Sequence, residues 1–130
     1  MPKRPSPHPT EAELEVLSIL WSRGPSTVRE VHEVVLQHRE TSLTTTLKTL
    51  QVMTQKGLVI RGEERPQKFT SAVPEETTQA GMLRDLVEKA FGGSAKKLVM
   101  QLVNGDVTPE ELKEMERLIR ATRIENRGGK

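Results

Sequence analysis

The chain has 130 residues, of which 34% are hydrophobic, so it can form one ordinary domain or two small ones with a limited core. It contains no cysteine, which excludes disulfides, thiolate metal sites and cysteine nucleophiles. The formal net charge of +2 is too small to indicate a nucleic-acid partner by itself. No apolar run approaches a membrane span or a signal-peptide core, so we expect a cytoplasmic protein.

The first nine residues contain four prolines, and proline at this density prevents a helix. Lys3 and Arg4 give the same stretch a positive charge. We therefore expect residues 1–9 to form a flexible basic arm.

Two capping boxes predict the first two helices. Thr10 with Glu13 begins a helix that ends before a Gly-Pro pair. Thr27 with Glu30 begins a second, shorter helix that ends near His38.

A third helix is predicted over residues 42–57, and its two faces differ. At about 100° per residue, the face expected to pack holds Leu43, Thr46, Leu47, Leu50 and Met53. The opposite face holds Thr44, Thr45, Lys48 and Val52. No Asp or Glu occurs between Thr41 and Lys56. Threonine and lysine can contact phosphates and base edges, so this face is suited to DNA; the alternative is an ordinary solvated face.

After Gly57 the apolar pattern changes to that of two strands joined by a turn over residues 62–66. Arg61, Arg65 and Lys68 make this hairpin basic. Three helices followed by such a hairpin predict a winged helix-turn-helix domain over residues 10–74, with the third helix in the major groove and the hairpin on the DNA backbone.

The charge distribution supports this organisation. Residues 10–40 hold three arginines and six glutamates, a net charge of −3. Residues 41–74 hold five lysines or arginines and two glutamates, a net charge of +3. Positive charge is therefore concentrated in the predicted DNA-binding helix and hairpin.

Three more amphipathic helices are predicted over residues 75–130: the first over about 75–91, the second over about 94–103, ended by Asn104-Gly105, and the last from Thr108. They carry more apolar surface than one copy covers, so we expect a dimerisation domain and a fold that is mainly α with a small β hairpin. The predicted interface consists of Leu83, Leu86, Val87, Phe91, Leu98, Leu102, Leu112, Met115 and Ile119. The alternative is that these helices pack back onto the N-terminal domain in a monomer.

Patterns of enzymes and metal sites are missing from the sequence. His32 and His38 are six residues apart and would point about 240° apart on a helix. Gly92-Gly93-Ser94 lacks the spacing of a phosphate-binding loop and is better explained as a helix break with a serine cap. We expect no enzyme activity, no metal and no cofactor.

Four segments, TEAELEVLSILW, SLTTTLKTLQVMTQKGLV, KFTSAVP and FGGSAKKLVMQLV, resemble the penicillinase-repressor family (BlaI/MecI) of winged-helix repressors in order and spacing. The resemblance covers about residues 10–120. It implies a homodimer that binds a palindromic operator, controls β-lactam-response or related genes, and is inactivated through cleavage by a membrane sensor protease. It places Ser42, Thr44, Thr45 and Lys48 on positions that contact DNA in such proteins.

The sequence also departs from the family's pattern. Leu47 and Val52 stand where the best-known members have arginines, so their operator sequence does not carry over. The cleavage dipeptide, Asn-Phe in those members, falls at Gln101-Leu102. Because there is no cysteine, the copper-responsive branch of the family is disfavoured.

Two functions remain at this point. The first is a dimeric DNA-binding repressor, which the charge contrast between the two N-terminal segments favours. The second is a winged-helix module that binds proteins and does not read DNA.

Overall fold

The computed structural model describes residues 8–128, and within them the chain forms six helices and one two-stranded antiparallel sheet. The predicted mainly α fold with a small β hairpin is therefore confirmed. Residues 1–7 of the predicted basic arm lie outside the described residues. The chain divides into two compact units, Met1–Leu83 and Arg84–Lys130.

The first two helices, α1 (Glu11–Arg23) and α2 (Val28–Leu36), each begin at the predicted capping box. In α1, the side chain of Thr10 accepts a hydrogen bond from the backbone N–H of Glu13, and the Glu13 carboxylate accepts one from the backbone N–H of Thr10. Thr27 and Glu30 repeat this arrangement in α2. Both helices are therefore fixed locally at their first turn.

Helix α3 (Leu43–Lys56) follows a loop and ends at Gly57, which has the left-handed φ of 82°. The backbone N–H of Gly57 donates to the last carbonyls of the helix, and Leu58 N–H donates to the Met53 carbonyl at 2.9 Å. This αL termination turns the chain directly from α3 into the hairpin.

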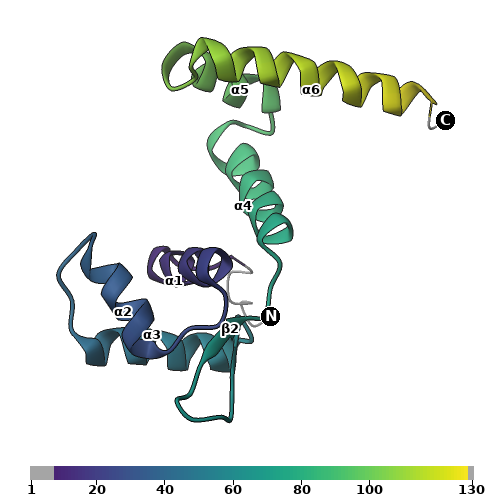
Figure 1. Cartoon of the computed structure of the whole chain (residues 1–130). Helices are drawn as coiled ribbons and strands as arrows, with labels where there is room; N and C mark the ends of the chain where they lie inside the picture. Colours follow the sequence, from purple (N-terminus) through teal and green to yellow (C-terminus); the bar gives the residue numbers. More distant parts are fainter. Residues whose placement is uncertain (1–7, 129–130) are drawn as a thin grey trace, which may run out of the picture. The chain divides into compact units, whose positions relative to one another are not determined.

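The hairpin consists of β1 (Val59–Arg61) and β2 (Phe69–Ser71), paired with Val59 opposite Ser71. It is attached to the helices through Ser26, which exchanges two backbone hydrogen bonds with Phe69 at 3.1 and 2.7 Å. Figure 1 shows the hairpin projecting from the group formed by α1, α2 and α3. This is the three-helix and hairpin arrangement predicted for a winged helix-turn-helix domain.

The core of this unit lies between the three helices and the base of the hairpin. It is formed by Val16, Leu17, Ile19, Leu20, Val31, Val35, Leu50, Met53, Val59 and Phe69. Trp21 packs at its edge, and its Nε1–H donates to Ser71 Oγ at 2.9 Å and to the Val73 carbonyl at 3.0 Å. This residue therefore ties α1 to the end of the hairpin and to the segment that leads into α4.

Three helices follow: α4 (Glu75–Ala90), α5 (Ala95–Gly105) and α6 (Pro109–Gly128). Asn104 and Gly105, expected to end the middle helix, instead form its last turn, and Asp106 is the C-cap. A glycine in the final turn has little helix left to destabilise, so it does not stop the helix where the sequence suggested. None of the helices among residues 8–128 combines the length and apolar character of a membrane span.

Candidate nucleic-acid interface

One side of α3 is fixed in the core of the N-terminal unit. Leu50 and Met53 are fully buried, and Thr46 is only 4% exposed. The hydroxyl of Thr46 is hydrogen-bonded to Nδ1 of His32 on α2 at 2.9 Å. The hydrogen bond and the buried side chains together set the rotation of α3 about its axis, and so decide which side chains face outward.

The outward face carries Thr44, Thr45 and Lys48, all exposed. Gln51 and Gln55 are exposed as well, although they were not among the predicted site residues. Helical spacing could have found them, because they lie only about 60° and 20° around the helix from Lys48. The face therefore presents hydroxyls, amides and one cation.

Leu47 corrects a prediction, because it was expected to pack and is instead 37% exposed. The covered strip of α3 includes Leu50, and Leu47 lies about 60° farther around the helix. The core of this small unit does not extend so far. Val52 lies on the opposite edge of the outward face and is similarly exposed, at 36%.

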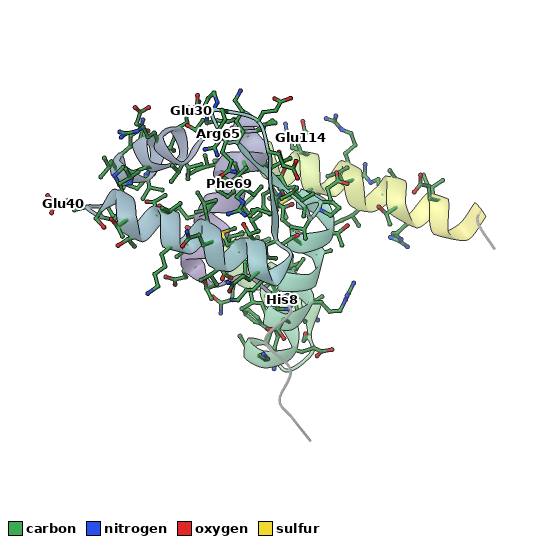
Figure 2. The ribbon with its side chains drawn as sticks, turned by 90° about the horizontal axis from the view of Figure 1, so that it is seen from below. His8, Glu30, Glu40, Arg65, Phe69 and Glu114 are labelled. Carbon is green, nitrogen blue, oxygen red and sulfur yellow. The ribbon has the colours of Figure 1, made fainter. Side chains whose placement is uncertain are left out.

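The first turn of α3 is capped by Ser42, whose Oγ accepts a hydrogen bond from Thr45 N–H at 3.1 Å. The two hydroxyls of Ser42 and Thr45 are also hydrogen-bonded, at 2.9 Å. The N-terminus of a helix is the positive end of its dipole, and its free N–H groups favour an anion such as a DNA phosphate. The nearest preceding carboxylate, Glu40, is exposed and points away from the helices (Figure 2).

The far end of α3 is held by an ion pair between Lys56 Nζ and Glu13 Oε2, 2.7 Å apart. The Glu13 side chain is only 6% exposed. Burial raises the pKa of Glu13, but hydrogen bonds from Lys56 and from the backbone of Thr10 outweigh this effect and leave the pKa below its usual value. The pair connects the last turn of α3 to the first turn of α1, so both ends of α3 have defined contacts.

The hairpin contributes Arg61, Arg65 and Lys68, and all three are exposed. Lys68 lies close enough to α2 for its charge to act on Glu30. The pKa of Glu30 is lowered first by the backbone N–H of Thr27 and then by the positive charges of Arg23 and Lys68. The positive charge of the hairpin is therefore partly balanced near Lys68.

The predicted interface residues of the C-terminal half lie on helices α4, α5 and α6, except Phe91, which directly follows α4. Leu83, Leu86, Leu102 and Ile119 are exposed, whereas the half-buried members are Val87, Phe91, Leu98, Leu112 and Met115. Gln101 is exposed next to Leu102, and the bond between these two residues lies within α5. Among residues 8–128, no cluster of three or more His, Asp or Glu side chains is arranged to hold a metal ion.

Comparison with known proteins assigns the family. The family model described as penicillinase repressor matches residues 9–121. The chain belongs to the penicillinase repressor family. It is thus a DNA-binding transcriptional repressor with a winged helix-turn-helix, as the resemblance of the sequence implied.

The sequence identity between this chain and its individual relatives is low. The chain is 28% identical over 92 residues to the transcriptional regulator BlaI of Mycobacterium tuberculosis, covering 69% of this chain and 67% of the relative. A MarR family protein from Bacillus stearothermophilus is similar in structure, with a TM-score of 0.49, 20% identity, and coverage of 90% of this chain and 74% of that one. BpsR of Bordetella bronchiseptica has a TM-score of 0.45 and 17% identity, with coverage of 92% and 78%.

Proposed function

We propose that this repressor acts as a homodimer that binds a palindromic operator, with α3 of each copy in the major groove and each hairpin against the DNA backbone. The single observation that carries the proposal is the outward face of α3. It has one cation, several hydroxyls and amides and no carboxylate, and the opposite side of the helix is fixed in the core. An α-helix with such a face fits the major groove of B-DNA.

Each part of this surface has a chemical role in the proposed complex. Ser42 and the first turn of α3 receive a phosphate, whereas Thr44, Thr45 and Lys48 reach base edges. Arg61, Arg65 and Lys68 contact phosphates and supply affinity that does not depend on sequence. Glu63 and Glu64 lie at the tip of the hairpin and are exposed, so we place these two carboxylates away from the phosphates.

The dimer is supported by the exposed apolar side chains of α4, α5 and α6. Side chains such as Leu86 and Ile119 are exposed in a single copy, and a second copy with the same surface would cover them. A dimer presents two α3 helices to DNA, and binding to two half-sites makes the second contact intramolecular. Helix-turn-helix dimers separate their half-sites by about 34–36 Å, one turn of DNA.

Two parts of the proposal rest on the resemblance and on the cellular location of DNA. The protein would act in the cytoplasm, and a membrane sensor protease would release repression by cutting Gln101-Leu102. Both side chains are exposed, but the bond lies inside α5, so the helix has to open locally before a protease binds it. The cut would separate α6 from the rest of the proposed dimer domain.

The test is selection of bound sequences from a random duplex DNA library by the intact chain. The proposal predicts enrichment of an inverted repeat with half-sites about one helical turn apart. The alternative, a winged-helix module that binds proteins only, predicts no enrichment over the starting library. A single enriched half-site without a symmetric partner would support DNA reading and contradict the dimeric arrangement.

A further inference from the structure

Two apolar side chains stand at the edges of the DNA-facing surface of α3. Leu47 is 37% exposed and Val52 is 36% exposed, on either side of the polar strip that contains Lys48. Exposed apolar groups gain nothing from water, and the core of the unit is already complete without them. Their position beside that strip means that a partner bound to this face of α3 would cover them.

The chemistry of the major groove supplies a partner of the right kind. Thymine is the only standard base that presents an apolar group there, its C5-methyl. On the same A·T pair, adenine presents N6 and N7, which a glutamine amide can bind with two hydrogen bonds.

Each of the two apolar side chains has a glutamine neighbour on the helix surface. Gln51 is four residues after Leu47, and Gln55 is three residues after Val52, so each pair lies on adjacent positions of α3. An apolar group beside an amide matches the methyl and the adenine edge that one A·T pair displays. Lys48, which lies about 20° around the helix from Gln55, remains available for guanine or phosphate.

We propose that Leu47 and Val52 read thymine methyl groups, which makes A·T pairs the preferred bases at both edges of each α3 footprint. This inference rests on the proposed function, because it requires α3 in the major groove. It gives a base-reading role to Val52, which the sequence placed on the face suited to DNA, and to Leu47, which was expected to pack.

The experiment uses the intact chain and the duplex enriched from the random library. Each thymine of a half-site is replaced in turn by deoxyuridine, which removes the methyl group and leaves base pairing and the adenine edge unchanged. Dissociation constants are then measured for the original protein, Leu47→Ala and Val52→Ala. Leu36→Ala is the matched control, because Leu36 is an exposed leucine on α2, outside the α3 face.

We expect deoxyuridine at two positions of each half-site to weaken binding by the original protein about fourfold each, the value of one buried methyl group. Leu47→Ala should remove the effect at one position and Val52→Ala at the other, whereas Leu36→Ala should keep both. The readout for each protein is the ratio of its dissociation constants for the deoxyuridine and thymine duplexes. A general loss of affinity in a variant changes both constants by the same factor, so it leaves this ratio unchanged.

Four outcomes would overturn the inference. If deoxyuridine has no effect on the original protein, or the same effect on all variants, Leu47 and Val52 do not read thymine, although the proposed function stands. An enriched half-site without A·T pairs would likewise show that Leu47 and Val52 do not read thymine. If the library yields no enriched sequence, the proposed function itself fails, and the inference fails with it.

Discussion

Nδ1 of His32 lies 2.9 Å from Oγ1 of Thr46, and this hydrogen bond joins α2 to the buried side of α3, the helix proposed to face DNA. Thr46 is the polar member of an otherwise apolar strip, which includes Leu50 and Met53. Because the bond has a fixed geometry, it defines the rotation of α3 more narrowly than apolar packing alone. The direction in which Lys48 and its neighbours point therefore depends on a contact on the opposite side of the helix.

Replacing Thr46 by valine tests the role of this bond. Thr46→Val keeps the shape of the side chain and removes the hydroxyl, so we expect the free energy of unfolding to fall by about 1 kcal/mol. Thr49→Val is the control, because the Thr49 hydroxyl donates only within α3, to the Thr45 carbonyl at 3.0 Å. Urea unfolding measures both variants. Equal stability of Thr46→Val and the original protein would show that the bond does not fix α3.

The Glu13–Lys56 pair predicts a pH-dependent stability. The folded pKa of Glu13 lies below its usual value of 4.5, so the pair stabilises the fold fully above that value. This stabilisation is lost as the pH falls through the lowered pKa. Glu13→Gln should cost about 1 kcal/mol near neutral pH, and less at about pH 2. Urea unfolding across this range measures the difference; a constant difference would contradict the assigned role of the charge.

The hairpin is expected to contribute affinity without selectivity. Arg61→Ala should weaken binding to the enriched duplex and to a shuffled duplex by similar factors, because a phosphate contact carries no sequence information. The slope of log K against log salt should fall by about one unit. Titrations at several salt concentrations measure this slope. A slope that stays the same would place Arg61 away from the phosphates.

The dimer can be tested by adding a charge to an exposed apolar position. Ile119→Glu places a carboxylate in the predicted interface, so we expect monomers in sedimentation equilibrium and a loss of affinity for the palindrome of about 100-fold. Ile124→Glu is the matched control on the same helix and lies outside the predicted interface. Ile119 and Ile124 are 57% and 70% exposed, so neither change disturbs a buried site. A dimeric Ile119→Glu protein would contradict the interface.

Much of the fold could be predicted because its signals are local. The capping boxes at Thr10 and Thr27 and the helix end at Gly57 depend on residues a few positions apart, and the structure contains all three. Helical spacing also indicated correctly that Lys48 is exposed and Leu50 is buried.

The contacts between elements could not be predicted in the same way. The bonds of Trp21 to Ser71 and Val73 join residues about fifty positions apart, and no local pattern encodes them. The exposure of Leu47 depends on how wide a strip of α3 the core covers. Helical periodicity gives the direction of each side chain, but the size of the neighbouring helices decides how much of the surface of α3 is covered by the core.

If α3 reads base sequence as proposed, the Lys48→Ala substitution should affect binding to two duplexes unequally. Lys113→Ala is the control, because it removes one exposed lysine from α6, outside the proposed DNA surface. Dissociation constants are measured for the enriched duplex and for a shuffled duplex of the same composition. We predict that Lys48→Ala weakens binding to the enriched duplex by about 1–3 kcal/mol and to the shuffled duplex by less, whereas Lys113→Ala changes neither. Equal losses on both duplexes for Lys48→Ala would contradict the assignment of α3 to the major groove.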